Sequence, residues 1–117
     1  MRILVCGGRD YTDQANVDKV LFDETGLRDQ YKSGTIIHGN ARGADSLAAS
    51  WGYRMGWKVE AYPADWKTHG RKAGPIRNKQ MLEEGKPDLV IAFPGGKGTA
   101  DMIRQAEAKS IRIKIVR

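Results

Sequence analysis

The sequence predicts a Rossmann-like α/β fold, a three-layer sandwich in which a parallel sheet of about five strands lies between about four helices. Short apolar runs alternate with longer segments whose apolar residues recur every three or four positions, which is the pattern of strands alternating with helices. The connections are short, which favours right-handed crossovers and a sheet covered on both faces. Glycines follow three of the apolar runs, as tight strand-to-helix turns require.

Five segments have the features of strands. The run from Arg2 to Cys6 is apolar and ends at two glycines, which suits a buried parallel strand. Residues 111–116 alternate apolar and basic side chains, which is typical of an edge strand with one face in water. The predicted strands are 2–6, 35–39, 57–62, 88–93 and 111–116.

Four segments have helical periodicity. Gly26 is a break in the first of them, and Gly56 ends the second. Pro75 suits the first turn of the third helix, where its missing N–H is not needed. Residues 63–74, which precede it, are predicted to form a loop. The predicted helices are 12–31, 44–55, 75–82 and a fourth after Gly96 with the apolar face Met102, Ile103 and Ala106.

Length and composition indicate a single globular domain over residues 1–117. The sequence is 40% hydrophobic and 29% charged, and it holds no apolar run near the ~20 residues of a membrane span, so no membrane partner is expected. Cys6 is the one cysteine, which excludes an intramolecular disulfide and suits the cytoplasm. That cysteine and two histidines show no metal-ligand spacing, so neither a metal nor a cofactor is predicted.

The net charge of +6 favours anionic partners. Basic residues concentrate at 65–79 and 109–117, whereas residues 10–29 are acidic. A charged face that serves only solubility explains the same pattern equally well.

The chemistry is expected at the carboxyl ends of the strands, where ligands bind in open parallel sheets. Glycine-rich segments follow three strands there, at 7–10, 39–45 and 94–99. They allow the backbone to approach a phosphate, and the helix after each loop offers unpaired N–H groups. Arg9 and Arg42 can each clamp phosphate oxygens with two hydrogen bonds, whereas Lys97 acts as a point charge. Turn geometry alone explains any one of these loops, but three together favour an anion site.

Several single residues keep two interpretations. Thr99 is placed either to cap the last helix or to offer its hydroxyl to a phosphate. Asp45 either accepts hydrogen bonds from a ribose or base, or balances the dipole of its helix. Cys6 and His38 are expected to be structural. No G-x-x-x-x-G-K-[ST] or G-x-G-x-x-G motif occurs, which disfavours a P-loop triphosphatase and a dinucleotide oxidoreductase.

Four blocks, at 5–9, 38–45, 73–78 with Met81, and 93–99, resemble the SLOG superfamily. The resemblance covers essentially the whole chain and is closest to the small stand-alone proteins of the YspA-like kind. It implies a Rossmann-like fold that binds a nucleotide or a nucleotide-derived, phosphate-bearing ligand. Together with the loops it predicts these ligand-binding residues: Gly7, Gly8, Arg9, Gly39, Arg42, Gly43, Asp45, Arg77, Asn78, Gly95, Gly96, Gly98 and Thr99.

The same superfamily includes the lonely-guy phosphoribohydrolases, whose loop P-G-G-x-G-T-x-x-E ends in a catalytic glutamate. Met102 stands at that position here, and Asp101 lies one residue earlier, about 100° away around the helix. Arg77 matches the arginine of their E-R-K-x-x-M pattern, without its flanking glutamate and lysine. Because N-glycosidic cleavage needs a nearby carboxylate, binding is favoured, no catalytic residue is predicted, and an enzyme acting on nucleotide N-glycosidic bonds is the alternative.

Residues 39–45 and the pair Arg77 and Asn78 also resemble blocks of the DNA-processing protein A, which binds single-stranded DNA. That resemblance implies single-stranded nucleic acid as a second candidate partner for the basic residues 65–79. Trp66 then either stacks on a base or covers the core. SLOG relatives are commonly dimers, which makes a homodimer a candidate state.

Overall fold

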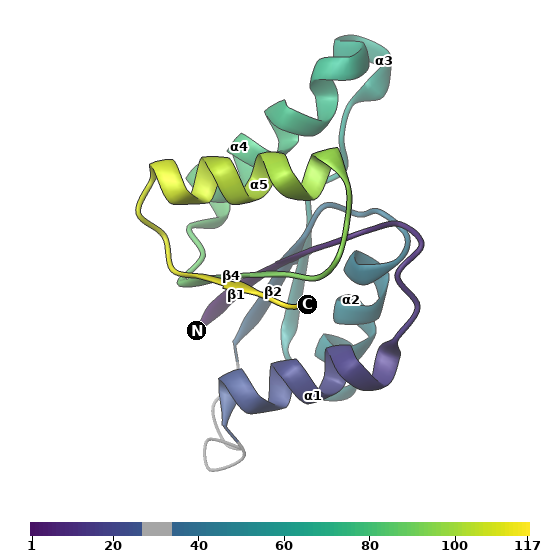
Figure 1. Ribbon diagram of the computed structural model, residues 1–117, viewed down its shortest axis with the longest axis vertical. Coiled ribbons are helices and arrows are strands. Elements are labelled where there is room, and N and C mark those ends of the chain that lie inside the picture. The colour runs from purple at the N-terminus through teal and green to yellow at the C-terminus, as the bar shows by residue number, and fades with distance from the viewer. Residues whose placement is uncertain (27–33) are drawn as a thin grey trace.

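The strands form one parallel sheet, as predicted. The computed structural model describes residues 1–26 and 34–117, and Figure 1 shows how they are arranged. The five strands lie in the order β3-β2-β1-β4-β5, and every neighbouring pair is parallel. The strands are β1 (Arg2–Cys6), β2 (Thr35–His38), β3 (Lys58–Ala61), β4 (Leu89–Ala92) and β5 (Ile113–Ile115).

Two long helices cover each face of the sheet, which completes the predicted sandwich. In Figure 1, α1 and α2 lie on one face of the sheet and α4 and α5 on the other. β2 and β3 are added in turn on one side of β1, and β4 and β5 are then added on its other side. Because crossovers are right-handed, this change of direction also changes the face that the helices cover. The helical elements are α1 (Gln14–Thr25), α2 (Ala44–Arg54), α3 (Trp66–His69), the 3-10 turn η2 (Gly70–Lys72), α4 (Ala73–Gly85) and α5 (Lys97–Ala108).

The core consists of two apolar layers, one on each side of the sheet. Alternate residues of β1 serve the two layers: Ile3 and Val5 pack with α1 and α2, whereas Leu4 packs with α4 and α5. All four residues of β4 are buried as well. This two-sided burial explains why the central strands are continuous apolar runs in the sequence.

The prediction of a loop over residues 63–74 is wrong for most of that segment. The chain forms α3 and η2 there, and Asp65 caps α3 by accepting a hydrogen bond from the Thr68 N–H at 3.1 Å. Neither α3 nor η2 contains a buried residue. A helix without a buried face has no apolar stripe, so periodicity does not reveal it.

The remaining helix boundaries agree with the sequence in part. α4 begins at Ala73, which leaves Pro75 in the first turn as predicted, but the helix continues to Gly85. The predicted first helix extends to residues 27–31, which lie outside the described residues. Within the part of the chain that the structure describes, no helix is long and apolar enough to cross a membrane.

β5 is an edge strand, as the alternation of apolar and basic residues predicted. Two basic side chains in or next to β5 form ion pairs. Glu24 of α1 pairs with Arg112 at 3.2 Å and with Lys114 at 3.0 Å. The fold therefore neutralises part of the positive charge of residues 109–117.

Candidate functional site

The three glycine-rich loops meet at the carboxyl edge of the sheet. They follow β2, β1 and β4, which are neighbours in the sheet. The middle loop is held on both sides, because the Gly8 N–H donates to Pro94 O at 2.8 Å and Gly8 O accepts from the Ala44 N–H at 3.2 Å. The predicted convergence is confirmed. It occurs where the sheet changes direction, which is the usual place for a ligand in an open α/β sheet.

Close packing between the loops explains three of their glycines. A β-carbon at Gly43, where φ is +80°, would collide with Gly8 O. One at Gly95 would lie 2.7 Å from Gly8 N, and one at Gly7 would lie 2.6 Å from the Ala44 β-carbon. These positions need glycine for loop packing, whether or not a ligand is bound.

Two other glycines face open space at the start of α5. A β-carbon at Gly96 or Gly98 would meet no heavy atom within 4 Å. Gly96 is the N-cap of α5, and the backbone N–H groups of Lys97, Gly98 and Thr99 have no acceptor among the described residues. Unpaired donors at the positive end of a helix dipole are the groups that bind anions in many proteins, and no side chain fills the space beside them here.

A cavity of about 910 Å³ opens beside this helix end. Its walls come from the loops after β1 and β4 and from the first turns of α4 and α5. The predicted ligand-binding residues that line it are Gly7, Gly8, Arg9, Asp45, Arg77, Asn78, Gly95, Gly96, Gly98 and Thr99.

A second cavity, of about 490 Å³, adjoins the first and is lined in part by the loop after β2. Gly39 and Arg42 line this smaller cavity, whereas Arg9 and Arg77 line both. The Arg42 side chain is 76% exposed, and its Nη2 pairs with Asp10 at 3.4 Å. Gly43, the remaining predicted residue, lines neither cavity and acts through its contact with Gly8.

Arg77 of α4 lies in the wall that the two cavities share. Its Nη1 donates to Gly39 O and to Tyr62 O, the latter at 3.4 Å, and its Nε donates to Asn78 Oδ1 at 3.1 Å. Burial lowers the pKa of the guanidinium, but an arginine remains charged at any physiological pH. No acceptor within residues 1–26 and 34–117 bonds its Nη2, so two donors are left for a ligand.

Asn78 connects α4 to the start of α5. Its Nδ2 donates to Gly98 O at 3.2 Å and to Asp101 Oδ2 at 3.0 Å, and its side chain is buried. Its oxygen accepts from Arg77, so the amide group is fully engaged within the protein. Asn78 therefore positions Gly98 and Asp101, and its direct contact with a ligand stays a prediction.

Asp45 fixes the loop after β2 from the first turn of α2. Its Oδ2 accepts hydrogen bonds from the N–H groups of Gly39 at 2.8 Å and Ala41 at 3.4 Å. Burial raises the pKa of this carboxyl to about 6, against the opposing effects of the two hydrogen bonds and of Arg77 and Arg9. The carboxyl group shapes the loop, and a hydrogen bond to a ribose or base stays a prediction.

His38 and Cys6 occupy structural positions, as expected. His38 Nδ1 accepts from the Asn40 N–H at 3.0 Å, and burial lowers the pKa of the imidazole, which keeps it neutral. Burial raises the pKa of the Cys6 thiol to about 12, so it is not an ionised nucleophile. No three or more His, Cys, Asp or Glu side chains of the described residues are grouped to hold a metal ion.

Thr99 does not cap α5, so this part of its prediction is wrong. The helix begins at Lys97 with Gly96 at the N-cap and no side-chain cap. Thr99 is thus the third residue of the helix, and its hydroxyl packs where a side chain on Gly95 would lie. Its hydroxyl as a phosphate donor stays a prediction.

The cavity contains a carboxylate, although not at the position of the glutamate in the lonely-guy pattern. Met102 is fully buried in the core between α5 and the sheet, whereas Asp101 lines the larger cavity. Asp101 Oδ2 accepts hydrogen bonds from Asn78 at 3.0 Å and from Gln105 at 2.8 Å. The turn of about 100° between adjacent helix positions is what separates core from cavity here.

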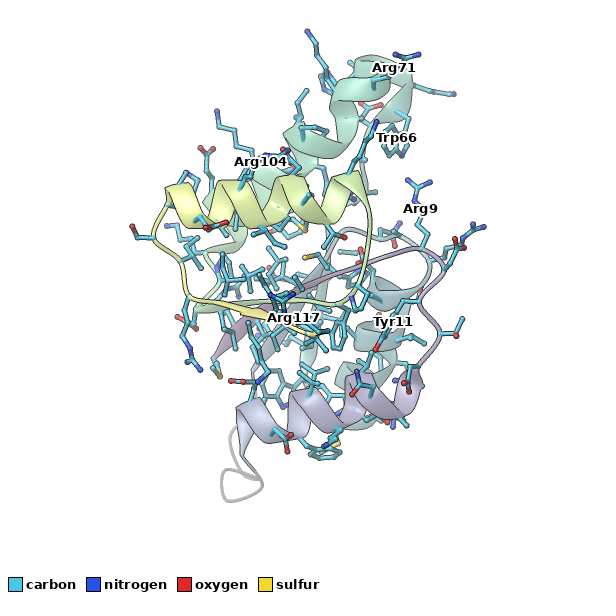
Figure 2. All side chains as sticks on the ribbon, viewed as in Figure 1. Arg9, Tyr11, Trp66, Arg71, Arg104 and Arg117 are labelled. Atoms are coloured by element: carbon cyan, nitrogen blue, oxygen red, sulfur yellow. The ribbon has the colours of Figure 1, made fainter. Side chains whose placement is uncertain are left out.

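Trp66, Arg71 and Arg104 are among the residues outside the predicted ligand-binding set that line the cavities. Trp66 is 50% exposed and lines both of them, so the interpretation that it covers the core is wrong. Arg71 and Arg104 line the larger cavity, and Figure 2 shows the Trp66 side chain above that of Arg9. A signal for Arg104 exists in the sequence, because it follows Lys97 by seven residues and so lies on the same helix face.

Comparisons with known proteins identify the family. The model of YAcAr, the YspA, cpYpsA-related SLOG family, matches residues 1–69. The chain is also 39% identical over 119 residues to the Gene 61 protein of Mycobacterium phage D29, an alignment that covers 96% of this chain and 93% of the phage protein. With its parallel sheet, its glycine-rich loops and these matches, the chain belongs to the YspA, cpYpsA-related SLOG family.

Proposed function

We propose that the chain binds a nucleotide or a nucleotide-derived, phosphate-bearing small ligand in the two adjoining cavities. The observation that carries this proposal is the open first turn of α5, where unpaired N–H groups face space beside Gly96 and Gly98. A phosphate there receives backbone hydrogen bonds and the field of the helix dipole. Membership of a SLOG family supports a nucleotide-derived ligand.

The charges around the larger cavity also favour an anion. Asp45 and Asp101 are satisfied within the protein, the first by backbone N–H groups and the second by Asn78, Gln105 and Arg104, whose Nη2 lies 3.6 Å from it. The cations outnumber the carboxylates in the walls. The cationic residues that line this cavity are Arg9, Arg71, Arg77, Lys97 and Arg104.

The sizes of the cavities suit a nucleotide. Ligand sites typically measure ~300 to 1,000 Å³. The larger cavity, of about 910 Å³, is at the upper end of that range, and the smaller one adds about 490 Å³. A phosphate at α5 therefore leaves space for the sugar and the rest of the ligand.

The test begins with native mass spectrometry of the freshly purified protein, which identifies a co-purifying ligand by mass. Calorimetric titration with ribose 5-phosphate and with nucleoside mono- and diphosphates then measures affinity. Gly96→Val places a side chain in the open space at the N-cap of α5. We expect it to abolish binding of every phosphate-bearing probe and to leave the far-UV circular dichroism unchanged.

The matched control is Ala100→Val, which adds bulk to an exposed α5 residue that lines neither cavity. It should bind like the unmodified protein. If no probe binds, or if Gly96→Val binds with unchanged affinity, the phosphate site at α5 is excluded.

One observation favours a second function, cleavage of a nucleotide N-glycosidic bond. The Asp101 carboxylate lines the larger cavity, and a carboxylate stabilises an oxocarbenium-like centre. Incubation with nucleoside monophosphates, followed by chromatography of free base, tests it. We expect no release above background; release that Asp101→Asn abolishes would establish the enzyme.

A further inference from the structure

A single tryptophan marks the boundary between the two cavities. Trp66 lines both of them, with Arg9, Ala41 and Arg77. The Arg9 Cζ atom lies 5.8 Å from the centroid of its indole. In Figure 2, the Arg9 side chain projects from the loop after β1 toward the ring, which comes from α3. The two groups thus face each other from different elements of the fold.

Packing of the core does not explain Trp66. It belongs to α3, which buries no residue, and half of its surface is exposed. Trp51 and Trp57, by contrast, pack together at a centroid distance of 5.2 Å in one core layer. The exposed half of the ring leaves apolar surface in water, and a ligand that stacks on it would remove that surface.

The surroundings of Trp66 keep its position defined. Asp65 caps the single turn of α3, and a β-carbon at Gly74 would lie 3.6 Å from the indole Cη2. The ring therefore rests against the first turn of α4, the helix that also carries Arg77. A flat ring and a planar guanidinium held at a cavity mouth are the groups on which nucleic-acid bases stack.

We propose that the ligand carries a planar base, which stacks on Trp66 at the junction with the smaller cavity while its phosphate binds at the start of α5. This inference rests on the proposed function and deepens it, because it says that the base of the ligand contributes to the affinity of the protein for it. Arg9 contributes its guanidinium plane and its charge to the same contact.

The experiment compares adenosine 5′-monophosphate with ribose 5-phosphate, which has the same phosphate and sugar but no base. Stacking on one aromatic side chain strengthens binding by about 10- to 100-fold. We expect the unmodified protein to prefer the nucleotide by such a factor in calorimetry. Trp66→Ala should lose that preference and keep its affinity for ribose 5-phosphate, and Trp66→Phe should restore most of it.

Two further variants separate stacking from other effects. Tyr53→Ala removes an aromatic side chain that is 71% exposed and lines neither cavity, so the preference should not change. Arg9→Lys keeps the charge but not the plane, and should reduce the preference for the nucleotide. Because α3 carries Trp66 outside the core, the nucleotide should also quench a fluorescence component that Trp66→Phe lacks.

The outcomes are distinct. Equal affinities of the unmodified protein for the two probes would overturn the base contact and leave the phosphate site standing. Equal weakening of both probes by Trp66→Ala would also overturn it, because the residue would then act on the loops. Binding of neither probe would overturn the proposed function together with this inference.

Discussion

At the scale of single residues, buried polar groups at this site serve the loops before they serve a ligand. Asp45, His38 and Asn78 are all buried, and each bonds a backbone group of a glycine-rich loop or of the residue beside it. Such groups cost stability when they are left without partners, so their positions are well defined. Asp45 is the carboxyl group among them, and its energetic effect can be measured by titration.

We expect Asp45 to make the free energy of unfolding depend on pH. Its pKa is about 6 in the folded chain and 3.8 when exposed. Between these values the folded state binds more protons than the unfolded state, so the contribution of Asp45 to stability falls as pH rises from about 4 to about 6. Because a shift of about 2 units corresponds to about 3 kcal/mol, the loss is large enough to resolve by urea unfolding.

The comparison with Asp45→Asn isolates this effect. Asparagine keeps the acceptor oxygen but does not titrate, so its stability relative to the unmodified protein should rise by a few kcal/mol between pH 4 and 6.5. Asp10→Asn, at a side chain that is 96% exposed, serves as the control and should show no such trend. A constant difference between Asp45→Asn and the unmodified protein over this range would contradict the prediction.

At the scale of elements, the glycine loops work as one packed unit. The loop after β1 is held between the other two, because the Gly8 N–H donates to Pro94 O and Gly8 O accepts from the Ala44 N–H. Gly43 lies at the tightest point, where its φ of +80° and the nearby Gly8 O exclude a side chain. Stability and site geometry are therefore coupled in these loops.

Gly43→Ala should destabilise the chain by roughly 3 kcal/mol or more, because strained φ and a backbone collision add. Gly56→Ala is the matched control, since its φ is +72° and a β-carbon there meets nothing within 4 Å. It should cost only about 1 kcal/mol. Chemical denaturation measures both, and equal losses would show that the contact between Gly43 and Gly8 is unimportant.

Periodicity predicted the elements with a buried or partly buried face and missed α3 and η2, in which every residue is exposed. β4 and α5 were found because buried residues recur along them, whereas α3 buries nothing and was assigned to a loop. The convergence of the loops followed from the rules of parallel sheets. That Asp101 and not Met102 lines the cavity could not be predicted, because it depends on how α5 is rotated against the sheet.

At the scale of the whole molecule, positive charge is unevenly neutralised. Arg112 and Lys114 pair with Glu24. In contrast, no carboxylate among residues 1–26 and 34–117 forms an ion pair with the exposed cations of α3 and η2. These cations are Lys67, Arg71 and Lys72. If the protein binds single-stranded DNA, we expect these three residues to contact its phosphates.

The dependence of affinity on salt distinguishes a small ligand from a strand. Log affinity for single-stranded DNA falls by about 0.7 per log unit of salt for each phosphate contacted. We expect a shallow slope for a nucleotide in the cavities and weak binding of a labelled oligo-dT in fluorescence anisotropy. Replacing Lys67, Arg71 and Lys72 with serine should weaken oligo-dT binding little more than the control does. The control replaces Lys109, Arg112 and Lys114 with serine and so removes the same formal charge. Tight oligo-dT binding with a steep slope, flattened only by the first triple change, would make the protein a strand binder.

The exposed position of α3 and η2 has a consequence for how such a protein can change over time. Residues 65–72 are all exposed, so substitutions there remove no core contact. Gly7, Gly43 and Gly95 have no such freedom, because a side chain there would collide with atoms of the neighbouring loops or of α2. Ligand preference can therefore diverge through residues 65–72 while the folding requirements of the chain stay constant. In a laboratory selection for new ligands, this segment is the one to randomise.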